Sequence, residues 1–266
     1  MAKLLACVKL VADLENVVPS DWQVSENGRE IPMENVGRIM NVCDANALEL
    51  ALRLKESGRL RAPQLTVLTV GEETTQKMLR TARAIGADRC VRIPSARESG
   101  YAPDRTARLL CDAISRMGGF DLLFFGTSAG EYDMGQTGIL VARLLGCPCI
   151  QDAVGVEGLE TGQIRVTHMT EQGVAQSVTA GPAVLTVATP PGISLRSPTL
   201  KAMLAAADTS EELLEIRETS PAGEGKRLMC LKIPREVKTC TFLNPEAPGE
   251  AVMTICSIRA QGGEGP

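Results

Sequence analysis

The residues best suited to bind a ligand lie in a glycine-rich loop, residues 126–138, between an apolar run and a helical pattern. We predict that the helix begins at Gln136 and Thr137. The first N–H groups of a helix point into the space before it, and the helix dipole adds partial positive charge there. The loop therefore predicts a phosphate-binding site. The alternative is a tight connection without a ligand, because many helix N-termini bind no anion.

Two other strand ends are expected to lie beside this loop. Residues 7–10 and residues 69–71 each close an apolar run. In an open parallel sheet, ligands bind beyond the carboxyl ends of the strands, where loops from neighbouring strands meet. We therefore expect one nucleotide cleft that is built from these three strand ends.

Other chemistries are disfavoured by missing motifs. The loop lacks both the Gly-Lys-Ser/Thr ending of ATP-hydrolysing phosphate loops and the Gly-x-Gly-x-x-Gly pattern of NAD-binding folds. The single histidine, His168, falls in a predicted strand without a paired acid nearby in sequence, so no nucleophile with its base can be assembled. Cys147 and Cys149 flank Pro148, but one histidine and no Cys-x-x-Cys pair leave no zinc ligand set. We predict neither a catalytic site nor a metal site.

The elements that must position the cleft alternate between strand and helix patterns through the first two thirds of the chain. This alternation predicts an α/β fold in which helices cover both faces of a parallel sheet. The predicted strands are residues 4–10, 65–70, 90–93, 122–125 and 183–188. The predicted helices are one capped by Asp44 and ended by Gly58, then residues 75–85, one that begins at Asp104, and residues 139–145.

Less regular segments are expected to add smaller features. Asn27-Gly28 predicts a hairpin turn between residues 24 and 31, and residues 154–157, 164–170 and 174–179 predict an antiparallel ribbon. Residues 198–207 and 210–217 have helical composition. We expect a nucleotide-binding domain over residues 1–207 and a C-terminal arm over residues 208–266. The arm holds two apolar patches, which we expect to add strands to a sheet or to lie on a partner.

Composition excludes two further classes of protein. A net charge of -4 and an aromatic content of 3% do not favour binding to nucleic acid, which requires neutralised phosphates and stacking side chains. The N-terminal run MAKLLACVKL lacks the anatomy of a signal peptide, and eighteen apolar residues nowhere run together. An odd number of cysteines, nine, fits buried thiols in a reducing compartment. We therefore expect a cytoplasmic protein that does not insert into membranes.

Several segments, in this order, resemble the beta subunits of electron transfer flavoproteins. They are Val8-Lys9-Leu10-Val11-Ala12-Asp13, Asn41 with Asp44-Ala45-Asn46-Ala47-Leu48-Glu49, Leu79-Arg80-Thr81-Ala82 with Gly86-Ala87-Asp88, and Asp133-Met134-Gly135-Gln136-Thr137-Gly138. The resemblance covers about residues 3 to 207. It implies an adenine-nucleotide-binding (Rossmann-like) fold and a partner, the alpha subunit, which holds the redox FAD. It also implies that this chain is an electron carrier without enzymatic activity of its own, and that it binds AMP or, in bifurcating members, a second FAD.

The same resemblance implies which residues touch the nucleotide. Matching positions are Cys7, Asn41, Val70, Gly126, Asp133, Gln136 and Thr137. We add their neighbours at the strand ends and around the loop, which are Val8, Lys9, Asp44, Gly71, Ser128, Ala129 and Gly135. Departures from the family pattern at Gly130-Glu131-Tyr132 and at Gly135 leave the choice between AMP and FAD open.

A proline-rich segment, residues 190–203, is similar to the loop with which this family recognises acyl-CoA dehydrogenases or other flavin dehydrogenases. Leu195 is our candidate for an apolar anchor, with Arg196 and Pro198 beside it. The alternative is a plain loop that ends in a helix start, which Pro198 would suit in any case. For the whole chain, the alternative to a carrier subunit is a free-standing nucleotide-binding sensor module of the same fold.

Overall fold

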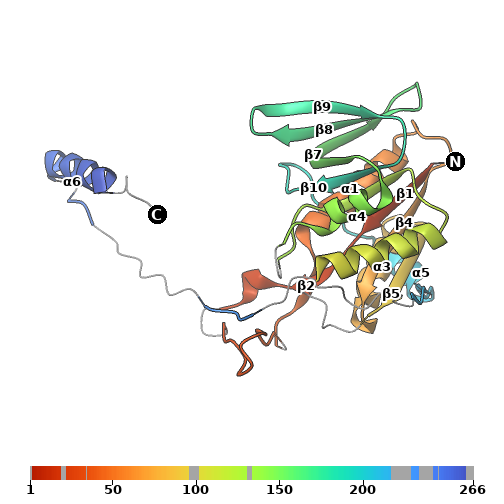
Figure 1. Ribbon diagram of the computed structural model, residues 1–266, viewed down its shortest axis with the longest axis horizontal. Coiled ribbons are helices and arrows are strands. Elements are labelled where there is room, and N and C mark those ends of the chain that lie inside the picture. The colour runs from red at the N-terminus through yellow and green to blue at the C-terminus, as the bar shows by residue number, and fades with distance from the viewer. Residues whose placement is uncertain are drawn as a thin grey trace. The chain divides into compact units, whose positions relative to one another are not determined.

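The computed structural model describes residues 2–18, 22–33, 35–95, 102–130, 134–216, 229–233, 242–244 and 246–261; residues 258–261 are described for their backbone alone. The chain divides into two compact units, Met1–Leu231 and Lys232–Pro266. The first unit is an α/β domain and contains the predicted cleft. Figure 1 shows its sheet with helices packed against it.

In the described residues, nine strands form one sheet in the order β11-β5-β4-β1-β6-β10-β7-β8-β9. The strands β11 to β7 in that order run parallel, and β8 and β9 run antiparallel to their neighbours. The parallel strands are β1 (Lys3–Cys7), β4 (Gln64–Gly71), β5 (Arg89–Pro94), β6 (Leu122–Gly126), β7 (Cys149–Gly158), β10 (Ala183–Val187) and β11 (Glu212–Leu213). The strands β8 (Ile164–Thr170) and β9 (Gly173–Thr179) continue the sheet past β7, at the top of Figure 1.

Helices cover both faces of the parallel part, because each presents an aliphatic stripe to it. On one face, α1 (Val42–Glu56) and α2 (Gln76–Ala84) bury side chains in a first core around Leu48 and Phe124. On the other face, α3 (Pro103–Arg116) and α4 (Thr137–Leu145) build a second core around Leu110 and Phe125. The predicted α/β architecture is therefore confirmed.

Strand order reverses between β1 and β6. From β1, the chain adds β4 and then β5 on one side, and β6 and then β10 on the other side. Connections leave this point toward opposite sides, so the loops beyond Cys7 and Gly126 separate and leave a crevice between them. This topological switch point is where an open parallel sheet binds its ligand.

A small ribbon projects from the carboxyl end of β1. Strand β2 (Leu10–Ala12) pairs antiparallel with β3 (Arg38–Met40), as a two-stranded sheet of its own, and a short 3-10 helix, η1 (Leu14–Asn16), follows β2. The sequence predicted one strand over residues 4–10. The structure divides it, because the N–H of Lys9 donates to the carboxylate of Asp44 (2.8 Å) and not to a neighbouring strand.

Two other local predictions are wrong, and one is right only in part. Asn41, and not Asp44, is the N-cap of α1, and Asp44 lies in the first turn. Of the segment 210–217, the described residues 210–216 contain the edge strand β11 and no helix. At Asn27-Gly28 the turn exists, with Gly28 at φ +68° and the N–H of Ser25 donating to the Glu30 carbonyl (2.8 Å). No strands flank this turn in the described residues, because the side chains of Ser25 and Asn27 take part in its hydrogen bonds.

The segment after β10 leads to α5 (Leu200–Ala207), which contacts α2. In the second unit the described residues contain α6 (Pro248–Gln261), on which Val252, Met253 and Ile255 are exposed. No helix in the described part of the chain is both long enough and apolar enough to cross a membrane.

Candidate functional site

A cavity of about 350 Å³ lies at the switch point, beyond the carboxyl ends of β1, β4 and β6. This volume is at the lower end of the range for small-molecule sites, which is about 300–1,000 Å³. Its walls come from the ends of these strands, the loop before α4, the β2–β3 ribbon and α3. The position is the one that the sequence predicted for a nucleotide.

The cavity brings together most of the residues that the sequence singled out. They are Cys7, Val8, Lys9, Asp44, Val70, Gly126, Ser128, Ala129, Gly135, Gln136 and Thr137. Asn41 and Gly71 lie just outside the lining, and Asp133 is outside the described residues. The three predicted strand ends therefore converge.

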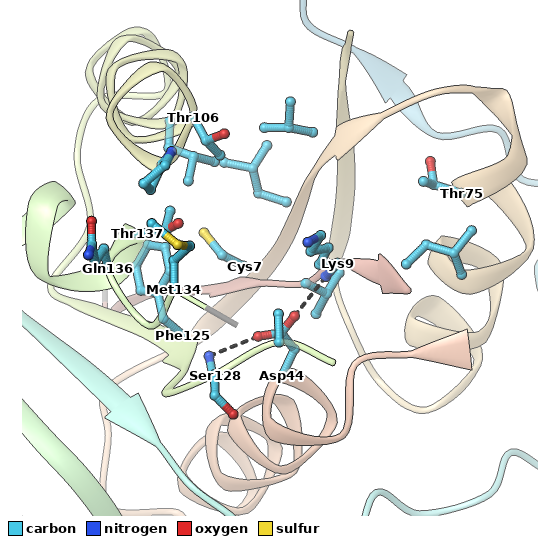
Figure 2. A pocket seen from close by; sticks show the side chains of 18 of the residues that line it. Cys7, Lys9, Asp44, Thr75, Thr106, Phe125, Ser128, Met134, Gln136 and Thr137 are labelled. Carbon is cyan, nitrogen blue, oxygen red and sulfur yellow. Dashed lines mark hydrogen bonds between the residues drawn. The ribbon is translucent and has the colours of Figure 1, made fainter. Parts of the chain in front are cut away.

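Residues that the sequence did not single out complete the walls. Leu10 and Arg38 reach the cavity from the β2–β3 ribbon. The loop after β4 and the 3-10 turn η3 (Glu73–Thr75) add Glu72, Thr74 and Thr75, and α3 adds Thr106. Figure 2 shows Thr75 on the opposite side of Lys9 and Asp44 from Met134 and Gln136. The run from Val70 to Thr75 could have been predicted from its place after a strand, whereas nothing local to Arg38 indicates that it folds back.

The first turn of α1 holds the floor of the cavity. Asp44 Oδ2 accepts the N–H of Lys9 (2.8 Å), and Asp44 Oδ1 accepts the N–H of Gly126 (2.9 Å). One carboxylate thus ties the end of β1 to the end of β6. Gly126 is required there, because a Cβ at this position would lie 2.8 Å from both Asp44 N and Cys43 Cβ.

Asn41 holds the loop that follows β6. Its backbone N–H donates to the Lys9 carbonyl (2.9 Å), and its side-chain Nδ2 donates to the Ser128 carbonyl (2.7 Å). The Asn41 Oδ1 accepts the N–H of Gly130 (3.4 Å). Asn41 therefore positions the wall of the cavity from behind, although it does not line the cavity itself.

The N-terminal end of α4 lines the cavity, through Gln136 and Thr137. The side chain of its N-cap residue, Gln136, makes no capping hydrogen bond, and the first turn carries no acidic residue. Gly138 allows the helix to begin against the sheet, because a Cβ there would lie 3.1 Å from the side chains of both Phe125 and Thr186. The first turn of such a helix favours an anion, because its N–H groups and the helix dipole present partial positive charge.

Burial determines the charge of the groups at the floor. It raises the pKa of Asp44 to about 7, although the hydrogen bonds from Gly126 and Lys9 act to lower it. Burial, with Asp44 nearby, also raises the pKa of the Cys7 thiol well above its ordinary value. Cys7 is therefore a neutral, apolar part of the wall and no nucleophile.

The predicted partner-binding residues lie in the segment that leads to α5. Leu195 is half-buried and packs against the first core, so its side chain is less exposed than the sequence suggested; its role in partner binding stays a prediction. Arg196 binds Glu49 and Glu56 of α1, and Pro198 is half-buried before the Thr199 cap of α5. The exposed leucines are Leu200 and Leu204, one turn apart on α5, with 76% and 64% of their surface accessible.

His168, Cys147 and Cys149, the other candidates for catalysis or metal binding, have structural surroundings. In the described residues, no group of three or more His, Cys, Asp or Glu could hold a metal ion. His168 Nε2 lies 3.0 Å from Ser177 Oγ on the neighbouring strand. This hydrogen bond gives the His168 side chain a structural role within the sheet. Burial raises the pKa of both Cys147 and Cys149, which disfavours thiolate chemistry at this pair.

Comparison with known proteins gives consistent matches. The family described as "Electron transfer flavoprotein domain" matches residues 31–210. The beta subunit of the electron transfer flavoprotein of Bradyrhizobium diazoefficiens is 32% identical over 184 residues, 69% of this chain and 70% of that protein. The beta subunit of Mus musculus is 31% identical, over 70% of this chain and 71% of that protein. The acryloyl-CoA reductase electron transfer subunit gamma of Anaerotignum propionicum is 30% identical, over 76% and 73%.

Proposed function

The chain belongs to the electron transfer flavoprotein family, and on that premise we propose that it is the beta subunit of a heterodimeric electron carrier. Its role is electron transfer, and we assign it no reaction on a substrate of its own. In this proposal an alpha subunit holds the redox FAD, which supplies all of the redox chemistry when it is bound. The observation that carries the proposal is the cavity at the β1/β6 switch point, with the uncapped start of α4 in its wall.

We propose that the cavity binds an adenine nucleotide. The N–H groups at the start of α4 receive its phosphate, beside Gln136 and Thr137. Lys9 and Arg38 also line the cavity and add positive charge. The apolar part of the wall, which includes Val70 and Phe125, suits the base.

A mononucleotide fits the cavity better than a dinucleotide does. The volume of about 350 Å³ is close to the lower limit for small-molecule sites, so a second FAD would extend beyond the described walls. We therefore propose AMP as the ligand and a carrier that does not bifurcate electrons. A second FAD in this subunit is the competing outcome, and it would favour bifurcation.

Partner recognition is proposed to use the exposed face of α5. Leu200 and Leu204 form an apolar patch on this helix, while the preceding segment is fixed to α1 through Arg196. We propose that a flavin dehydrogenase, such as an acyl-CoA dehydrogenase, docks on this patch. The name of the Anaerotignum relative, acryloyl-CoA reductase electron transfer subunit gamma, supports a partner that acts on a CoA thioester.

The arm over residues 208–266 is proposed to contact the alpha subunit. On α6, Val252, Met253 and Ile255 each expose more than half of their surface. A segment of this length has too little core of its own to keep such residues from water, so a partner surface is the natural place for them.

Cofactor extraction from the complex tests the proposal. The chain is co-purified with its partner subunit, the complex is denatured, and the released nucleotides are separated and counted. One FAD and one AMP for each heterodimer is the expected result. Two FAD for each heterodimer would mean that this subunit binds FAD in place of AMP, which would favour a bifurcating carrier. A colourless homodimer or monomer without a partner would favour the sensor module instead.

A further inference from the structure

Two groups of opposite electrostatic character line the same cavity. The start of α4 favours an anion, and the buried carboxyl of Asp44 opposes one. A short chain of contacts joins them: Asp44 Oδ1 binds the N–H of Gly126, Thr127 follows in sequence, and a Cβ on Gly135 would lie 3.1 Å from the Thr127 carbonyl. Gly135 immediately precedes the Gln136 cap of α4. A phosphate at the helix start and the Asp44 carboxyl therefore share one cavity, which both Gln136 and Asp44 line.

Resting on the nucleotide site proposed above, we propose that Asp44 sets the charge that this cavity accepts. An anionic nucleotide and an ionised Asp44 carboxylate oppose each other, so the nucleotide binds together with a proton on Asp44. Asp44 is thereby a specificity-determining residue, which favours the ligand with the fewest negative charges. AMP is preferred over ADP on this account, because the additional phosphate adds charge to the same space.

The surroundings of Asp44 make this carboxyl the group that changes its protonation state when an anion binds. Hydrogen bonds from two backbone N–H groups hold it in place, and the residue is 8% exposed, so solvent screens it little. Burial brings its pKa to about 7, so both charge states are available near neutral pH. Its position, and not only its pKa, links it to the ligand, because the carboxyl itself lines the cavity.

The other charged groups around the cavity act differently. Among the described residues, Lys9 follows β1, Arg38 lies on β3 and Glu72 follows β4, while the lining residues of α3 and α4 carry no charge. Lys9 and Arg38 carry basic side chains, which attract an anionic nucleotide. Glu72 is exposed to solvent, which screens it. Cys7 stays neutral.

Because the phosphate and an ionised Asp44 are both negative, nucleotide binding and protonation of Asp44 favour each other. A bound phosphate raises the pKa of Asp44 further, so binding takes up a proton wherever free Asp44 is ionised. The affinity for AMP therefore falls as pH rises through the neutral range, by up to about tenfold for each pH unit, which is the limit for one proton. The phosphate of AMP titrates near pH 6 itself, and its contribution has to be subtracted.

Calorimetric titration of the full chain with AMP, at pH 7.5 in two buffers of different ionisation heat, measures the proton uptake. Asp44→Asn keeps the side-chain shape and supplies the background of AMP itself. We expect more protons taken up for each AMP by the wild type than by Asp44→Asn, and a smaller preference for AMP over ADP in the variant. Glu73→Gln removes a nearby exposed carboxylate that does not line the cavity, and it should behave as the wild type.

Each outcome decides a separate question. AMP binding with equal proton uptake in the wild type and Asp44→Asn overturns the role of Asp44 and leaves the nucleotide site standing. Absence of AMP binding to the wild type between pH 5.5 and 8.5 overturns the proposed function itself. If Asp44→Asn does not fold, adenosine 5′-sulfate, an anion that does not titrate between pH 5.5 and 8.5, replaces AMP as the probe: the proposal then requires proton uptake with it, and binding without uptake overturns the proposal.

Discussion

Helix α1 carries two buried carboxylates that meet opposite partners. Asp44, in its first turn, accepts hydrogen bonds from the backbone N–H groups of Lys9 and Gly126 and from the side chain of Asn41, and burial raises its pKa to about 7. Glu49 is buried as deeply but accepts the guanidinium groups of Arg196 and Arg53. Burial acts to raise the pKa of Glu49 too, yet these arginines outweigh it and the pKa is lowered.

Asp44 and Glu49 thus show that the hydrogen-bond partners of a buried carboxylate, and not its depth, determine its charge and its role. A carboxylate paired with arginine stays charged and locks two segments together. Glu49 does this for the segment before α5. A carboxylate held by neutral donors remains able to take up a proton, and Asp44 keeps this ability beside the proposed phosphate position. One end of α1 is thus responsive, and its middle is a fixed anchor.

Gly126→Ala, which crowds the backbone and side chain of Asp44 at the start of α1, should have the largest effect. The new Cβ would lie 2.8 Å from Asp44 N, so backbone and not a flexible side chain must move. We expect the free energy of unfolding to drop by about 3 kcal/mol, as for severe overpacking, together with loss of AMP binding. Urea unfolding measures this. Gly37→Ala is the matched control, because a Cβ there meets nothing within 4 Å, and a similar loss in that variant would contradict the explanation.

Breaking the Glu49 anchor with Arg196→Met should have the next largest effect. The change leaves the carboxylate of Glu49 buried with Arg53 as its remaining partner. We expect a loss of about 2 kcal/mol in the free energy of unfolding, less than for a fully isolated buried charge. Amide hydrogen exchange should also become faster in α5.

The control for the anchor is an exposed pair. Arg165→Met removes the partner of Glu157 in β7, where both side chains are more than a third accessible. Exposed pairs of this kind contribute about 0–1 kcal/mol. Equal losses for Arg196→Met and Arg165→Met would show that the Glu49 contact is no anchor.

The pH dependence of stability separates the two carboxylates by sign. The folded pKa of Asp44 is raised from 3.8 to about 7, so its stabilising contribution is present at low pH and is lost as pH rises toward 7. The unfolding free energy of the wild type should fall relative to that of Asp44→Asn between pH 5 and 7, by up to about 1.4 kcal/mol for each pH unit. Chemical unfolding of both proteins at these two pH values provides the comparison, and parallel pH profiles would refute it.

The smallest effects distinguish structural from exposed leucines near the anchor. Leu195→Ala removes packing against the first core and should cost about 1–2 kcal/mol, since the side chain is only partly buried. Leu200→Ala, on an exposed side chain, should change the stability by less than about 0.5 kcal/mol. If thermal or urea unfolding showed a larger loss of stability for Leu200→Ala than for Leu195→Ala, the packing assigned to Leu195 would be contradicted.

Much of the fold could be predicted from the sequence, because buried strands and amphipathic helices alternate with clear turn residues. Gly126, Gln136 and Thr137 could be placed at a site since a glycine-rich loop before a helix has a general physical meaning. Cys7 and Val70 followed from their positions at strand ends. These are local signals, and they were sufficient to bring the walls of the cavity together.

The rest depends on contacts between residues far apart in sequence. Asp44 was predicted as a helix cap, but it binds the backbone of Gly126, 82 residues away. Glu49 and Arg196 are separated by 147 residues, and no local pattern indicates their contact. Strands of three residues, such as β2 and β3, are too short to show a period, so the arrival of Arg38 at the cavity could not be foreseen.

Hydrogen exchange of the chain with and without AMP tests most directly whether the switch-point cavity holds the nucleotide. We expect slower amide exchange on AMP addition at the start of α4, residues 134–140, and at residues 126–130, with little change in β8 and β9. Protection absent from these two segments, or confined to another part of the chain, would contradict it.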